Sequence, residues 1–112
     1  MLMIGSIKKE EDFKKIRRLG RRWSGGFVRL SILAGENEGA RSAVVVSKKI
    51  SNKAVVRNKI RRRVAAILRE YILIYEGKPV DILVTVIRND ATYEQLRLEI
   101  DKGLIQLLEN KR

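Results

Sequence analysis

Residues 47–63 read SKKISNKAVVRNKIRRR, and this stretch decides most of what the 112-residue chain is expected to form. It lies in a span, residues 39–69, that carries ten Lys or Arg residues and no Asp or Glu. The whole chain has a net charge of +12, so this span supplies most of it. Each phosphate that a Lys or Arg neutralises releases condensed counterions. The charge pattern therefore predicts a surface that binds a polyanion such as nucleic acid.

The same stretch predicts a long helix with one apolar and one basic side. Asn52 is expected to be the N-cap of a helix that begins near Lys53. At about 100° per residue, one side of this helix gathers Val56, Ile60, Val64, Ile67 and Tyr71. The opposite side gathers Asn58, Arg62, Ala65 and Arg69, flanked by Arg57 and Arg61. Guanidinium groups suit two-pronged contacts with phosphate, so the basic side is expected to face RNA or DNA.

The chain before this helix predicts a first helix and a β-hairpin. Apolar residues on one face of the first helix are Ile7, Phe13, Ile16 and Leu19. The acidic residues 10–12 favour its start, and Gly20 can end it. Residues 21–26 are expected to form a loop. Residues 27–33 and 43–47 are rich in β-formers, and the polar turn at 35–39 predicts that they pair as an antiparallel hairpin.

The chain after the basic helix predicts a strand and a last helix. The basic helix should end near residues 72–75, before Gly77 and Pro79, and residues 80–87 form a mostly apolar strand. Thr92 and Gln95 fit a capping box. The helix that follows has an apolar stripe made of Tyr93, Leu96, Ile100, Leu104, Leu107 and Leu108. The predicted fold is a single α+β domain, residues 1–112, with the order αββαβα: a two-layer sandwich of helices on a small mixed sheet.

Composition excludes several classes of function. The chain has no Cys and no His, so it has no disulfide, no Ser-His-Asp triad and no typical zinc site. Residues 1–4 are too short for the apolar part of a signal peptide, and the apolar run at 71–75 is far too short to cross a bilayer. A soluble, cytoplasmic protein is therefore expected. A helix lying on a membrane surface is the main alternative reading of the basic helix, but its apolar side lacks Trp and Phe.

These features together resemble the bacterial ribonuclease P protein subunit. The family signature is basic-Asn-basic-x-basic-Arg, preceded by Ser-Lys-Lys at the end of a strand. This chain has SKK at 47–49 and RNKIRR at 57–62. The resemblance extends to IKKEEDF at 7–13, to Phe27 in the first strand, to VDILV at 80–84 and to the Leu-rich last helix, and so covers nearly the whole chain.

The resemblance implies a protein that assists an RNA enzyme. In this family a catalytic RNA performs magnesium-dependent removal of the 5′ leader from precursor tRNA, and the protein alone is not catalytic. Mg²⁺ would be bound mainly by the RNA, with no metal site and no obligate protein partner for the protein. By motif position, the residues expected to contact the catalytic RNA are Lys48, Lys49, Lys53, Arg57, Asn58, Lys59, Arg61, Arg62 and Arg69. Phe13, Arg17 and Phe27 would lie in a cleft for the precursor-tRNA leader, where aromatic rings can stack on unpaired bases.

The resemblance also implies a left-handed crossover between two parallel strands around the basic helix, although general sterics favour the right-handed form in about 98% of cases. The chain departs from the family pattern at Ala65, where an Arg is common, and Arg69 one turn later is a candidate replacement. Arg17 stands where an aromatic residue is often found, and Ser51 stands near a common Gly.

Two further features have alternative interpretations. Trp23 is either a stacking platform for a base or a packed side chain, and the acidic residues 10–12 are either a magnesium site or a favourable helix start. The alternative functions are a ribosomal or general RNA-binding protein and a self-sufficient nuclease. The absence of His leaves the nuclease without an evident general base.

Overall fold

The computed structural model describes residues 5–34, 40–74 and 80–109. Its elements, in chain order, are β1 (Gly5–Ser6), α1 (Glu10–Leu19), β2 (Arg21–Ser24), β3 (Val28–Ala34), β4 (Arg41–Val46), α2 (Ala54–Ile74), β5 (Val80–Val86) and α3 (Tyr93–Glu109). The α+β class and the order of the larger elements agree with the prediction. The predicted turn at 35–39 and the stop at Gly77 and Pro79 lie outside the described residues.

The sheet does not contain the predicted hairpin. Its strand order is β1-β4-β5-β3-β2, so β5 lies between the two strands that were expected to pair. β5 is antiparallel to β3 and parallel to β4. All of its side chains are buried except that of Thr85, which is half-buried. A strand as apolar as this one is stabilised most at the centre of a sheet, where both faces and both edges are covered.

Two short strands at the sheet edges were not predicted. Residues 21–24, expected to be a loop, form β2 and pair antiparallel with β3. Along β2, half-buried and exposed side chains alternate, as in any strand with one covered face. Arginines occupy both faces of this strand and hide the alternation in the sequence. At the opposite edge, β1 pairs with β4 in parallel.

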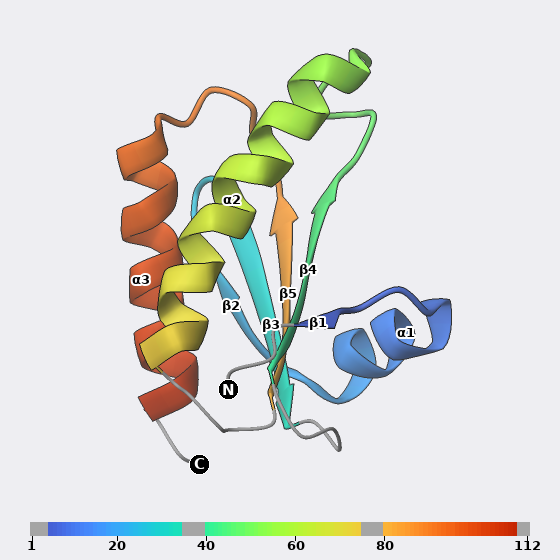
Figure 1. Cartoon of the computed structure of the whole chain (residues 1–112), viewed down its shortest axis with the longest axis vertical. Coiled ribbons are helices and arrows are strands. Elements are labelled where there is room, and N and C mark those ends of the chain that lie inside the picture. The colour runs from blue at the N-terminus through green and yellow to red at the C-terminus, as the bar shows by residue number, and fades with distance from the viewer. Residues whose placement is uncertain (1–4, 35–39, 75–79, 110–112) are drawn as a thin grey trace.

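The connection from β4 through α2 to β5 is left-handed, as the resemblance implies. The two strands are parallel neighbours. With α2 placed toward the viewer and both strands pointing up, β5 lies to the left of β4 (Figure 1).

Helices cover both faces of the sheet (Figure 1). α2 and α3 pack on one face, where the main core contains the predicted α2 residues Ile60, Val64 and Ile67. From α3 the core contains the predicted Leu96, Ile100, Leu104 and Leu107, whereas Tyr93 is exposed. The predicted capping box is confirmed: the Thr92 N–H donates to Gln95 Oε1 over 2.9 Å, and the Gln95 N–H donates to Thr92 Oγ1 over 3.1 Å.

α1 packs on the other face through a smaller cluster that contains Ile7, Ile16 and Leu83. Ile7 is buried but precedes the helix, and its N–H donates to Ser42 O. Leu19 was predicted to lie on the packed face, yet 56% of it is exposed, since it falls at the last turn, beyond the cluster.

The start of α2 also differs from the prediction. The Arg57 N–H donates to Lys53 O, so Lys53 rather than Asn52 occupies the N-cap position. The Lys53 N–H in turn donates to Ser51 Oγ over 3.2 Å. A short polar side chain two residues earlier therefore orders the entry to the helix.

Candidate nucleic-acid interface

The predicted basic row on α2 lies on the surface. The exposed members of the predicted set are Lys48, Lys49, Lys53, Asn58, Lys59, Arg61, Arg62 and Arg69. Within the described residues, none of them forms an ion pair with an acidic side chain. Their charges are thus available to an external polyanion. Ala65 is half-buried in the same stripe, and Arg69 stands exposed one turn later.

Two arginines of the motif donate internal hydrogen bonds that order the row. Arg57 is half-buried, and its Nη1 donates to Ser51 O over 2.9 Å, so it fixes the loop that leads into α2. Arg61 Nη1 donates to Asn58 Oδ1 over 2.6 Å. This contact occupies the acceptor of the Asn58 amide and leaves its NH₂ group to bind an acceptor on a ligand, such as a phosphate or a 2′-OH.

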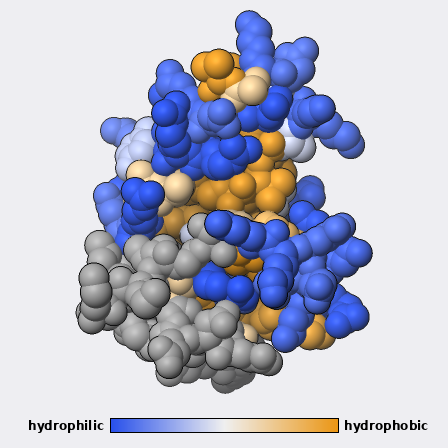
Figure 2. All heavy atoms as spheres, turned by 45° about the vertical axis from the view of Figure 1, so that its right-hand side comes forward, coloured by the Kyte–Doolittle hydropathy of each residue, from blue (hydrophilic) through white to orange (hydrophobic). Residues whose placement is uncertain are grey.

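Hydrophilic side chains cover both the N-terminal end of α2 and α1 on one side of the molecule (Figure 2). Apolar surface lies between them in this view (Figure 2). In β4, the half-buried Ala43 and Val45 pack against the α1 cluster, and Val44 packs against the main core on the opposite face. The strand that pairs with β4 at this edge, β1, covers only Arg41 and Ser42.

A groove runs along the sheet face that α1 covers only in part. Its volume is about 590 Å³, and its lining residues are Arg17, Arg22, Trp23, Ser24, Arg29, Leu30, Ser31, Leu83 and Thr85. Arg17 comes from α1, and the others come from β2, β3 and β5. Arg22 also donates a hydrogen bond to the backbone oxygen of Arg17, which ties β2 to the end of α1.

The structure brings only one of the three predicted leader-cleft residues into this groove. Arg17 lines it, whereas Phe13 and Phe27 do not. Phe13 is half-buried against the α1 cluster. Phe27 packs against the main core on the opposite face, with the Arg88 guanidinium carbon 5.1 Å from its ring centre. The sequence did not reveal Arg22 and Arg29 as groove residues, because their positions depend on the β2–β3 register.

The Trp23 ring packs against the main core beside α3, and a Cβ added at Gly103 would lie 2.7 Å from its Cε3. Gly103 therefore provides the space that the indole ring fills. Trp23 is also among the residues that line the groove, so its contact with a base stays a prediction. The neighbouring Arg21 donates from Nη1 to Leu107 O over 2.8 Å, so it too is directed to α3.

Glu99 on α3 holds the turn between β2 and β3. Its carboxylate accepts hydrogen bonds from the backbone N–H groups of Gly26, Phe27 and Val28, over 3.0, 2.9 and 3.1 Å. No local sequence pattern indicates this role, because the two segments lie more than seventy residues apart. The contact fixes the end of the groove where β2 turns into β3.

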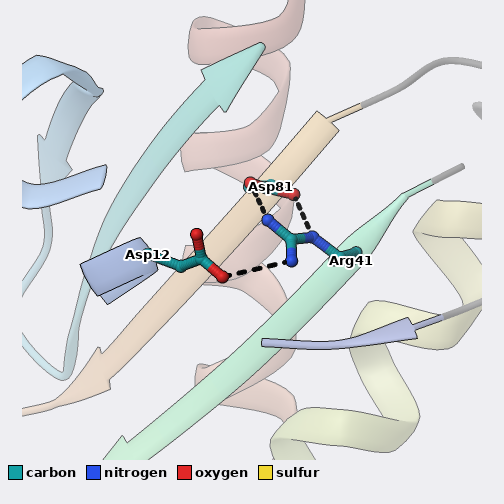
Figure 3. A network of polar contacts seen from close by, with 3 residues as sticks. All are labelled: Asp12, Arg41 and Asp81. Carbon is teal, nitrogen blue, oxygen red and sulfur yellow. Dashed lines mark hydrogen bonds and ion pairs between the residues drawn. The ribbon is translucent and has the colours of Figure 1, made fainter. Parts of the chain in front are cut away.

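An ion-pair network anchors α1 to the sheet (Figure 3). Arg41 on β4 donates from Nε to Asp81 Oδ1 over 2.9 Å and from Nη2 to Asp81 Oδ2 over 2.7 Å. Its Nη1 reaches Asp12 Oδ2 on α1 over 3.3 Å. The hydrogen bonds to Asp81, and then the charges of both carboxylates, raise the pKa of Arg41 above its ordinary value. Asp81 is the buried charged residue of the described chain.

The acidic residues at the start of α1 make separate contacts. Asp12 binds Arg41, and Glu10 Oε1 lies 3.9 Å from Lys14 Nζ. The described residues contain no group of three or more His, Cys, Asp or Glu side chains that could hold a metal ion. None of the described helices is long and apolar enough to cross a membrane.

A basic helix on one face of the sheet and an arginine-lined groove on the other, on a small α+β scaffold, define a nucleic-acid-binding protein. The family model for ribonuclease P matches residues 5–108. The chain therefore belongs to the ribonuclease P protein family.

Sequence relatives support this assignment. The chain is 34% identical over 92 residues to the ribonuclease P protein component of Pseudanabaena sp. (strain PCC 6903), which covers 80% of this chain and 79% of the relative. It is 30% identical over 104 residues to that of Clostridioides difficile (strain 630), covering 91% and 87%.

Solved structures show the same fold. The Staphylococcus aureus RNase P protein matches with a TM-score of 0.70 at 24% identity, covering 88% of this chain and 91% of that one. The RNase P protein from Thermotoga maritima matches with a TM-score of 0.70 at 21% identity, covering 96% and 97%.

Proposed function

We propose that the chain binds the catalytic RNA of ribonuclease P through α2 and holds the 5′ leader of precursor tRNA in the groove beside α1. As a member of the ribonuclease P family, the chain serves tRNA processing as the protein subunit of an endoribonuclease. The observation that carries the proposal is the exposed row of basic residues formed by Lys53 at the N-cap of α2 and by Lys59, Arg61, Arg62 and Arg69 on the helix. This row is free of acidic partners among the described residues.

The RNA, rather than the protein, performs the hydrolysis in this proposal. The protein has no His, and its described residues gather no cluster of potential metal ligands. Mg²⁺ is accordingly assigned to the RNA component, where it would activate the water that cleaves the leader. The protein contributes binding energy and position: guanidinium and ammonium groups on α2 neutralise phosphates that would otherwise repel one another.

The groove supports the second half of the proposal. It opens on the same side of the sheet as α1, and three arginines line it. A single-stranded leader is the part of the substrate that fits an open groove on a sheet face, because its backbone can follow the strands without the width of a duplex.

Reconstitution tests the proposal. The protein is combined with a bacterial ribonuclease P RNA, and cleavage of precursor tRNA is measured over a range of Mg²⁺ concentrations. We expect the protein to lower the Mg²⁺ requirement and to bind precursor tRNA with a leader more tightly than leaderless tRNA. If it does neither, it is a general RNA-binding protein and the proposal fails. Cleavage by protein alone, after RNase treatment, would identify a self-sufficient nuclease instead.

A further inference from the structure

The groove beside α1 is built from arginines and small hydroxyl side chains. Arg17, Arg22 and Arg29 line it, and the hydroxyls of Ser24, Ser31 and Thr85 complete the polar part of the lining. These three arginines are exposed. Their guanidinium groups can each make a two-pronged contact with a phosphate.

The sheet register sets the spacing of two of these arginines. Arg22 is paired with Ser31, and Ser24 with Arg29, so Arg22 and Arg29 are diagonal neighbours on adjacent strands. Diagonal neighbours on one face of an antiparallel pair lie about 7–8 Å apart. This separation lets each side chain reach a different phosphate of one RNA strand, while Arg17 approaches from α1.

The charge of the groove is not neutralised from within the described part of the chain. No acidic side chain there forms an ion pair with Arg17, Arg22 or Arg29. The carboxylates of Asp12 and Asp81, which lie where α1 meets the sheet, are both engaged by Arg41. The Arg22 contact with the backbone oxygen of Arg17 leaves the charges of both guanidinium groups in place.

Trp23 is the one aromatic residue among those that line the groove, and its ring is turned toward α3, where it packs beside Gly103. Phe13 and Phe27 lie outside the lining. Base recognition in single strands usually depends on such rings, since each base can stack on an aromatic face. The lining therefore offers mainly guanidinium and hydroxyl groups, which suit phosphate oxygens.

We propose that this groove binds the leader through its ribose–phosphate backbone, with Arg17, Arg22 and Arg29 as phosphate ligands, and without recognition of the bases. This inference rests on the proposed function, since it takes the leader as the occupant of the groove. Two results are required of leader binding. Its affinity depends on salt and on these three arginines. Its affinity does not depend on which bases the leader carries.

Charge-removing variants test the first requirement. We expect Arg22→Ala and Arg29→Ala each to weaken binding of leader-bearing precursor tRNA to the holoenzyme roughly tenfold, the loss of one charge-assisted contact. Each should also reduce the slope of log affinity against log salt by about 0.7, the value for one phosphate of a single strand. Lys102→Ala removes one exposed charge from α3, on the other side of the sheet, and should change neither quantity. Circular dichroism of each variant checks that the fold is intact.

Modified leaders test the second requirement with the unaltered protein. A leader with abasic sites should bind within about twofold of the normal leader, and one with uncharged methylphosphonate linkages should bind roughly tenfold more weakly for each lost contact. The opposite pattern, in which abasic sites weaken binding and methylphosphonates do not, would overturn the inference. So would unchanged affinity and salt slope in both arginine variants.

A comparison with leaderless tRNA distinguishes failure of the backbone-binding inference from failure of the proposed function. If the holoenzyme binds leader-bearing and leaderless tRNA equally, the proposed function itself is wrong. If it prefers the leader but is insensitive to leader phosphates and to Arg22 and Arg29, only the backbone-binding inference is wrong, and the leader lies elsewhere on the protein.

Discussion

Removal of the Asp81 side chain should destabilise the protein more than removal of any other single carboxylate in the Arg41 network. Asp81 accepts two hydrogen bonds from Arg41, and its side chain is only 6% exposed. Asp81→Ala leaves Arg41 mostly buried, with 23% of its side chain exposed, and with Asp12 at 3.3 Å as its remaining partner. Breaking a buried pair in this way costs about 3–5 kcal/mol. The remaining contact with Asp12 and the partial exposure of Arg41 reduce this cost, so we expect the free energy of unfolding to fall by about 2–3 kcal/mol.

Asp12→Ala is the matched control. It removes a carboxylate from the same arginine, but Asp12 makes one longer contact and its side chain is 27% exposed. A pair of this kind contributes about 0.5–1 kcal/mol. A third variant, Arg41→Met with Asp81→Leu, replaces both buried charges by apolar groups. We expect it to recover much of the loss, because the cost of Asp81→Ala comes from an uncompensated charge.

Urea unfolding, followed by circular dichroism and by Trp23 fluorescence, measures these differences. The two probes should report one transition, and the dependence of the free energy of unfolding on urea should be unchanged among the variants. An Asp81→Ala variant within about 0.5 kcal/mol of the parent protein would refute the reasoning. A larger loss for Asp12→Ala than for Asp81→Ala would also refute it, since burial would then not be what makes the pair important.

Three further outcomes follow from the same structure. Arg62→Ala should weaken binding of the catalytic RNA by about 1–3 kcal/mol and lower the slope of log affinity against log salt by about one unit, both measured by filter binding. An unchanged slope would mean that Arg62 contacts no phosphate. Glu99→Ala should speed hydrogen exchange at the amides that it binds in the β2–β3 turn and cost about 1–3 kcal/mol of stability, and equal exchange rates would contradict its role. Gly103→Ala should lower the free energy of unfolding by about 1–3 kcal/mol, measured by thermal or urea unfolding, because the added Cβ would overlap Leu30 Cδ1 and lie 2.7 Å from Trp23 Cε3. A neutral effect would mean that the indole ring can move away.

Local sequence patterns determined the helices and most of the basic surface. The period of α2 identified its buried face at Ile60, Val64 and Ile67, and a capping box identified the start of α3. These features depend on residues three or four positions apart, so they are encoded within a few turns of chain. The charge of residues 39–69 likewise required no tertiary information, because a long acid-free segment cannot neutralise itself.

Pairing between distant segments was decided only by the tertiary structure. β5 enters the sheet between β3 and β4 because its apolar side chains gain most from a central place, and this separates two strands that are close in sequence. Long-range contacts also place Arg22 and Arg29 in one groove, direct Trp23 to Gly103, and bring Glu99 to the β2–β3 turn. The sequence thus determined that a basic helix faces a polyanion. The fold alone decided that Arg22 and Arg29 meet Arg17 in the groove beside α1 while the Trp23 ring turns toward α3, because strand register sets which side chains share a face.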